Sequence, residues 1–251
     1  MIKNLVVGAW ALMVLFFAGC ESSAPATSSS PAQPFGDEFN GQVAVLPADV
    51  LSYLPEQYAF LHPMVNEATE QALIAQGYQV MTAHQVEQAL DANGGALRRR
   101  IQSSSPKEMA QGVNDLIWQL RDEQAVDVLA APQVLEQSLV IKRPYDGASW
   151  GGVRREFHVN GARNLGDSLQ VDTASVVMGV YNKFGQAIYF GQGGIDFLEN
   201  GTVAGQKIYL SPKLSGQIPI ASVQEAVDKA LARWQMELAV VMGQNGFERS
   251  R

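Results

Sequence analysis

Residues 169–190, LQVDTASVVMGVYNKFGQAIYF, decide the fold of this chain. Every second position from 174 to 180 is apolar (Ala, Val, Met, Val), which is the period of a strand with one buried face. Residues 182–185, NKFG, form a turn with asparagine first and glycine last. Residues 187–190 then return as a second apolar strand. The stretch therefore predicts an antiparallel β-hairpin.

Earlier in the chain, apolar strands alternate with helices. Residues 42–47, QVAVLP, predict a buried first strand closed by proline, and residues 78–81 predict a second. A helix lies between them, from near Pro63 to a stop at Gly77. Residues 82–85, TAHQ, form a capping box that opens the next helix, which we expect to end at residues 93–95, NGG. Residues 105–108, SPKE, open a third helix, with proline at its first position.

The rest of the chain gives a mixed pattern. We expect strands at 125–131 and 134–141, an irregular polar segment at 142–166 and a loop-rich segment at 191–220. Within the latter, residues 191–194, GQGG, are interpreted as a bulge or a close approach of backbones. A capping box at residues 222–225 opens the last and longest helix. This order predicts an α/β fold with a mixed sheet, parallel early strands and an antiparallel hairpin, packed by helices.

The N-terminus has the pattern of a secretory signal. Lys3 precedes an apolar run at residues 5–18, which is too short for a comfortable membrane span, and Ala18-Gly19 leads into Cys20, the only cysteine. This arrangement resembles the lipobox of bacterial lipoproteins, and the resemblance implies cleavage before Cys20 and acylation of its thiol, as with palmitate. Glu21 stands where an inner-membrane retention signal usually has Asp, which favours the outer membrane. The alternative is a buried thiol beside an uncleaved anchor helix.

Four segments follow from these features. Residues 1–19 are the predicted lipoprotein signal peptide, and residues 20–38 are the lipidated Cys20 with a Ser/Ala/Pro-rich tether. Residues 39–245 form the α/β domain, which would face the periplasm, and residues 246–251 are a tail. A flexible tether of this length has a root-mean-square reach of about 20–25 Å, which keeps the domain close to its membrane.

Charge and composition exclude several kinds of function. The formal charge is −7, and an acidic protein does not displace counterions from the phosphates of a nucleic acid, so we expect no nucleic-acid partner. His62, His84 and His158 lack the spacing of a metal site, and a chain without a second cysteine has no thiolate zinc site. No nucleophile elbow or phosphate-binding loop is present. We therefore expect a protein that is not an enzyme and that uses no cofactor.

The order of elements resembles the family of the curli secretion channel lipoprotein, whose fold is that of the amino-terminal domain of the Tol translocation protein TolB, an anticodon-binding-like fold. The residues that carry the resemblance are VAVLP at 43–47, the helix ending at Gly77-Tyr78, the strand and helix at 80–90, AVDVL at 125–129 and the hairpin at 171–190. Channel members insert hairpins into the outer membrane. The comparable residues 142–170 are charged and interrupted by glycine, so no lipid-facing row can be drawn through them.

Two segments carry residue types that dominate protein interfaces. The first, residues 142–163, has five basic and two acidic residues and offers Tyr145, Trp150, Arg154 and Arg155 as partner-binding candidates. In the alternative interpretation, Trp150 only pins the segment to the core. The second is the run Arg98, Arg99 and Arg100, which either docks an acidic partner or is a solvated helix face.

The sequence thus predicts a non-catalytic lipoprotein of the outer membrane. It would dock to, or help to assemble, a machine of the cell envelope, such as one for secretion, polysaccharide export or cell-wall synthesis. Its expected partners are the membrane, through the lipid anchor, and one or more envelope proteins, and a homo-oligomer is possible in this class. The first alternative is an oligomeric secretion channel subunit of the curli type, and the second is a periplasmic hydrolase.

Overall fold

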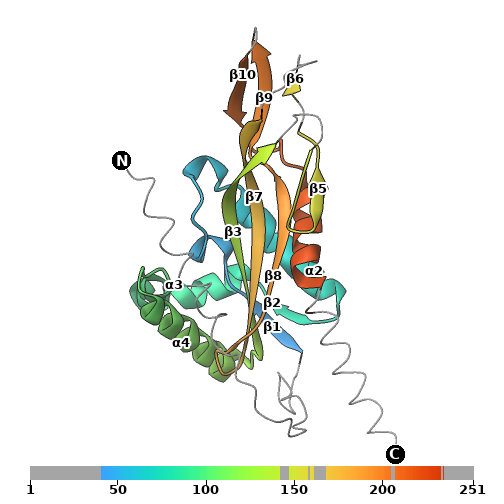
Figure 1. Cartoon of the computed structure of the whole chain (residues 1–251). Helices are drawn as coiled ribbons and strands as arrows, with labels where there is room; N and C mark the ends of the chain where they lie inside the picture. The colour runs from blue at the N-terminus through green and yellow to red at the C-terminus, as the bar shows by residue number, and fades with distance from the viewer. Residues whose placement is uncertain are drawn as a thin grey trace, which may run out of the picture. The chain divides into compact units, whose positions relative to one another are not determined.

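The computed structural model describes residues 41–141, 147–157, 159–160, 168–204, 207–232 and 234 (Figure 1). All of them belong to one compact unit, Gln33–Arg251. The predictions made for residues 1–40, including Cys20 and the tether, lie outside the described residues. The same holds for Tyr145, for His158 and for the tail.

A five-stranded mixed sheet forms the centre of this unit. Its strand order is β2-β1-β3-β7-β8, with the bounds β1 Gln42–Val45, β2 Gln79–Met81, β3 Val128–Ile141, β7 Leu169–Asn182 and β8 Ala187–Phe197. The strand β1 pairs in parallel with β2 and β3, whereas β3, β7 and β8 pair antiparallel. The predicted α/β class with a mixed sheet is therefore confirmed.

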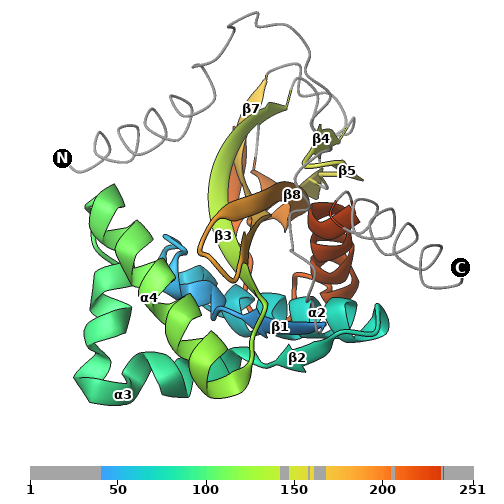
Figure 2. The same ribbon diagram turned by 90° about the horizontal axis from the view of Figure 1, so that it is seen from below.

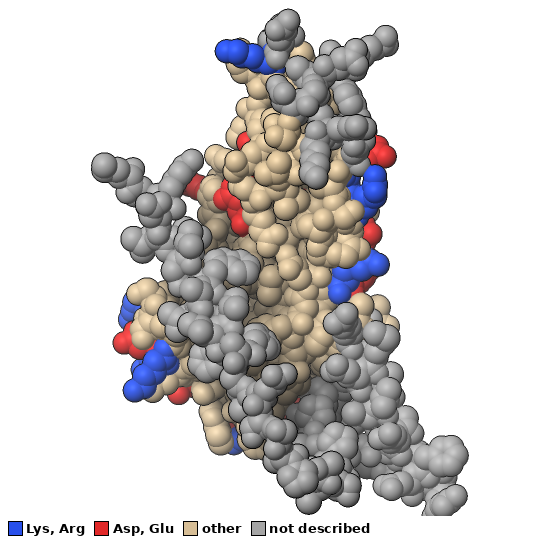
Figure 3. Space-filling model, viewed as in Figure 1, with Lys and Arg blue, Asp and Glu red and all other residues tan. Residues whose placement is uncertain are grey.

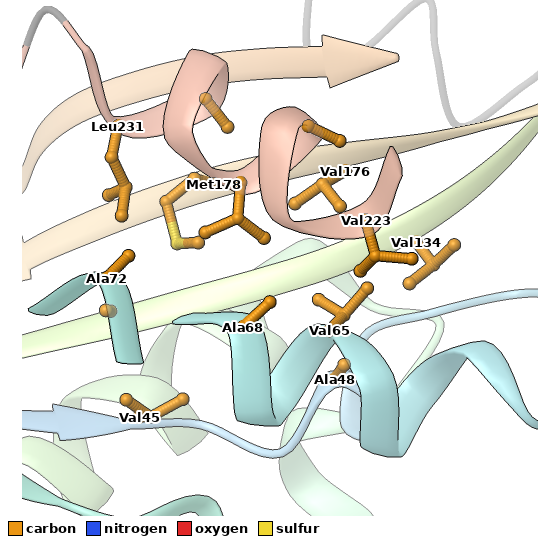
Figure 4. Packing of buried hydrophobic residues seen from close by; sticks show 14 of the residues in the cluster. Val45, Ala48, Val65, Ala68, Ala72, Val134, Val176, Met178, Val223 and Leu231 are labelled. Carbon is orange, nitrogen blue, oxygen red and sulfur yellow. The ribbon is translucent and has the colours of Figure 1, made fainter. Parts of the chain in front are cut away.

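Helices pack on both faces of the sheet (Figures 1 and 2). On one face, α2 (Leu61–Ala75) and a C-terminal helix at 220–232 and 234 enclose the largest core cluster, part of which is shown in Figure 4. Val176, Met178 and Val180 point into this cluster, as the alternation predicts. On the other face, α3 (Ala83–Ile101) and α4 (Pro106–Gln124) cover β1 and the start of β3. Two 3₁₀ turns, η1 (Ala48–Val50) and η2 (Glu56–Tyr58), join β1 to α2.

The predicted local signals hold at the hairpin and at two helix starts. Asn182 Oδ1 accepts the N–H groups of Phe184 and Gln186, each at 3.0 Å, so the side chain of the first turn residue holds the turn together. Thr82 and Gln85 form the full capping box of α3. Ser105 caps α4, accepting from the backbone N–H of Glu108 at 3.5 Å.

The helix α3 does not stop at residues 93–95. It continues to Ile101 and bends at Gly94 and Gly95, whose φ angles are +71° and +69° (Figure 2). Leu90 before the bend and Ile101 after it are both fully buried in the cluster under α4. Burial of the second half against α4 thus outweighs the poor helix propensity of the glycine pair.

The two strands expected at 125–131 and 134–141 are a single strand, β3. A proline usually interrupts a central strand because it lacks an N–H group. Here β1 pairs with β3 only as far as Ala130, so Pro132 lies where no neighbour on that side needs a donor. Beyond it, the N–H of Val134 is satisfied by Ser52 Oγ at 2.7 Å.

The segments expected to be irregular contain further strands. These are β4 (Ala148–Trp150), β5 (Val153–Arg155), β6 (Val159–Asn160), β9 (Glu199–Ala204) and β10 (Lys207–Pro212), and β8 itself extends to Phe197. They pack around a third core cluster, in which Trp150 and Phe157 meet Phe197, a residue distant from both in the sequence. The last helix begins at position 220, ahead of the predicted cap at Ser222, and the N–H of Ser222 donates to the carbonyl of Pro219.

Candidate partner-binding site

Trp150 is placed inside the fold. Its side chain is 8% exposed, its indole Nε1 donates to the carbonyl of Ala174 at 3.3 Å, and its ring lies 5.1 Å from that of Phe197. These are the contacts of the second interpretation, in which the tryptophan holds its segment on the core.

Arg155 is also used internally. Its Nε donates to the carbonyl of Ile195 at 2.8 Å, and its Nη1 pairs with Glu225 Oε2 at 2.6 Å. The guanidinium therefore joins β5, β8 and the C-terminal helix. Arg154 precedes it with an exposed side chain.

The arginine run divides into one internal and two surface residues. Arg98, 18% exposed, forms ion pairs with Asp49 at 3.3 Å, Glu87 at 3.1 Å and Asp91 at 2.9 Å. Arg99 and Arg100 are exposed and line an open hollow between α3 and α4 with Glu108, Gln111 and Asp115. Arg99 also donates to the carbonyl of Gly94, and Arg100 pairs with Asp115.

A second hollow brings together two histidines that are 22 positions apart in the sequence. His62 and His84 line it where the carboxyl ends of β1 and β2 meet the start of α2 and α3, together with Asp49, Asn66, Glu67, Glu70 and Glu87. Three of its four carboxylates have partners, because Asp49 and Glu87 bind Arg98 and Glu70 accepts the N–H of Ala83. Burial lowers the pKa of His62. Sequence spacing gave no sign of this pair.

No metal site accompanies these hollows. Within the described ranges, no group of three or more His, Cys, Asp or Glu side chains could hold a metal ion. The same residues include no helix long and apolar enough to cross a membrane.

Three carboxylates meet where β3, β7 and β9 approach each other. Glu136 lies beside Asp172, which accepts from Ser138 Oγ, and Glu199 accepts the N–H of Asp172 at 3.0 Å. Burial first, and then repulsion from Asp172, raises the pKa of Glu136. Burial also raises the pKa of Glu199, and the hydrogen bond from the Asp172 N–H offsets only part of this rise. The phenol of Tyr58 lies nearby, and burial raises its pKa as well.

The pKa values of these carboxyl groups are higher in the folded state than in the unfolded state. At pH values between the two, the native protein therefore binds more protons than the unfolded chain. Stability should therefore fall as pH rises from the ordinary carboxyl range through the raised values. We expect Glu136→Gln to raise the unfolding temperature at pH 7, and the difference from wild type to shrink as pH falls towards 4. Thermal melts across this range test the prediction. The exposed Glu123→Gln is the control, and an equal effect there contradicts the assignment.

Among the described residues, no helix covers the part of the sheet between α4 and the β4–β5 hairpin (Figure 1). The strand register places Gln133, Val177 and Gln192 in one row across β3, β7 and β8. Leu135 and Phe190 lie on the same face of the sheet, each two positions along its strand from this row. Gln192 is exposed, Phe190 is 47% exposed, and the other three are half-buried. We call these five residues the open sheet face. Sequence analysis missed it, since strand alternation does not show which face lacks a cover.

The charges flank this region. In Figure 3 the central strands are mostly uncharged, while Lys, Arg, Asp and Glu gather over α3 and α4 and along the opposite edge of the unit. An uncharged centre with a polar margin is the usual anatomy of a protein interface.

Comparison with models of protein families and with curated proteins gave no match. Among solved structures, the chain is similar to a crystal structure of a lipoprotein from Neisseria meningitidis, with 16% sequence identity and a TM-score of 0.36. The match covers 62% of this chain and 81% of that one. This similarity is too weak to support an argument. The described unit is classed as an α/β domain with a mixed sheet from its own strands and helices.

Proposed function

We propose that this protein is a non-catalytic lipoprotein of the outer membrane, anchored through Cys20 and facing the periplasm, which docks to a protein of a cell-envelope machine. The observation that supports docking best is the open sheet face. It combines Phe190 with the half-buried Leu135 and Val177 and with two glutamine side chains. A partner that binds there would bury apolar area without burying an unpaired charge.

The anchor is supported by the sequence around Cys20. The proposal assigns Arg99 and Arg100 to the polar rim of the docking surface, where charges affect association rate and selectivity more than affinity. Trp150, Arg98 and Arg155 take no part in it, because their side chains are largely buried by contacts within the domain.

Site-specific photocrosslinking in intact cells tests this function. A photoreactive residue at Gln192, on the open sheet face, is expected to give a discrete protein adduct. The same residue at Gln71, an exposed glutamine on α2 that lies across the sheet, is the matched control and should give none. Phe190→Asp should abolish the Gln192 adduct in protein that is still folded, which a thermal melt checks. The unfolding temperature should fall modestly, because the ring contact between Phe190 and Tyr181 at 6.2 Å is lost. Equal adducts from both positions, or none from Gln192, contradict the proposal.

A further inference from the structure

The N-terminal tether enters the fold at the same end of the sheet as the β7–β8 turn. Val43 of β1 is in register with Val128 of β3, and Val128 is in register with Asn182, the first residue of the turn. The N–H of Asp127 also donates to the carbonyl of Gln42 at 3.1 Å. The chain that follows Cys20 therefore joins the domain at this end of the sheet.

Two exposed aromatic side chains lie at this end, each with a cation beside it. Phe184, in the turn, is 53% exposed, and Lys183 Nζ lies 5.7 Å from the centre of its ring. Trp118, on α4, is 46% exposed and lies 4.0 Å from the guanidinium of Arg121. An aromatic body with a charged tip is the combination found at the headgroup level of bilayers.

The turn and α4 are held together, so the two aromatics belong to one surface. Gly185 packs directly against Asn114 of α4, and Trp118 is one helical turn beyond Asn114 on the same side of the helix. The hydrogen bonds from Phe184 and Gln186 to the Asn182 side chain fix the shape of the turn. We call Trp118, Arg121, Lys183 and Phe184 the turn-end surface.

The distance to the anchor suits a contact with the bilayer. From Cys20 to Gly41 the chain can span at most about 70 Å, and the tether predicted from the sequence would average about 25 Å. Such a tether keeps the attached end at high effective concentration near the membrane. The opposite end, where β9 and β10 lie, is farther away by the length of β7, whose 14 residues span about 45 Å (Figure 1).

We infer that the turn-end surface rests on the phospholipid bilayer to which the chain is anchored, with Trp118 and Phe184 at the headgroup level. The turn-end surface has two cations, Arg121 and Lys183. Two carboxylates nearby balance their charge, namely Asp122, which pairs with Arg121 at 3.1 Å, and the exposed Glu123. The contact therefore depends on aromatic insertion rather than on attraction to anionic lipid. It orients the domain so that β9 and β10 point away from the membrane. The inference rests on the proposed anchoring.

Tryptophan quenching by brominated phosphatidylcholine tests the contact. The chain from Cys20 onward, which contains every described element, can be coupled through its single thiol to a maleimide lipid in vesicles. It keeps three tryptophans, of which Trp150 and Trp234 are 8% and 1% exposed, so lipid quenching reports on Trp118. We expect quenching by brominated vesicles to fall at least about twofold in Trp118→Phe and in Phe184→Ser, as interfacial anchoring requires. Tyr209→Ser, an equally exposed aromatic on β10, is the control and should change nothing.

Equal quenching of wild type and Trp118→Phe, or an equal loss with Tyr209→Ser, overturns the inference. A photoreactive residue at position 118 that crosslinks in cells to a protein and not to lipid also overturns it, in favour of a protein partner. Coupling through the thiol supplies the anchor whether or not cells acylate Cys20. Failure of the quenching experiment therefore leaves the anchoring proposal standing, and absence of fatty acid in cells leaves the bilayer contact standing.

Discussion

Gly193→Ala is expected to displace the C-terminal helix and to lower the free energy of unfolding by about 3 kcal/mol, at the upper end for overpacked sites. A Cβ built on Gly193 would lie 2.6 Å from the carbonyl carbon of Ala226 and nearer still to its oxygen. These are backbone atoms of the helix, so no side-chain rotation relieves the clash. The predicted close approach of backbones at residues 191–194 is thereby confirmed.

The clash is costly because of what the helix buries. Val223, Val227 and Leu231 pack with Val176 and Met178 in the largest core cluster (Figure 4), and moving the helix opens that cluster. In a protein of this size, a loss of about 3 kcal/mol lowers the unfolding temperature by roughly 6–12 °C. Calorimetry or denaturant unfolding measures it. Gln192→Ala, which removes an exposed side chain from the same strand, should stay within about 0.5 kcal/mol of wild type. A Gly193→Ala protein as stable as wild type contradicts this packing.

Cys20→Ala is expected to abolish fatty-acid incorporation and to remove essentially all of the protein from the outer membrane fraction. Several acyl chains on one residue hold a protein stably on a bilayer, and the variant has no other cysteine to accept them. Whether the apolar run at residues 5–18 is cleaved or retained, a chain without the thiol lacks this anchor. Metabolic labelling with a fatty acid and density-gradient fractionation measure both effects.

Lys3→Arg, which keeps the positive charge of the N-terminus, is the matched control and should label and fractionate as wild type does. Unchanged labelling or an unchanged outer membrane share in Cys20→Ala contradicts anchoring at this residue.

The elements that sequence analysis predicted well are those fixed by neighbouring residues. The β7–β8 hairpin followed from strand alternation and from an asparagine that binds its own turn, and the start of α3 followed from the pair Thr82 and Gln85. The elements it missed depend on partners distant in the chain. Pro132 is compatible with β3 only because β1 ends beside it, and β4 and β5 form because Phe197 supplies a surface for Trp150.

The candidate site was predicted less well than the fold, for the same reason. Arg155 looked like an interface residue in the sequence, yet its partner Glu225 is 70 positions away, and their pairing turns the side chain inward. Phe190 looked like an ordinary strand residue, yet it is 47% exposed, because no helix in the described part of the chain covers that part of the sheet. Residue type alone does not separate these two cases.

The central claim is that cells fasten this domain to the outer membrane through lipid on Cys20. Mass spectrometry of the N-terminal peptide, isolated from the membrane fraction of cells, tests it most directly. The account predicts a chain that begins at Cys20 and carries fatty acyl groups on that residue. A peptide that begins at Met1 with a free thiol at position 20, or one cleaved elsewhere and free of fatty acid, would contradict it.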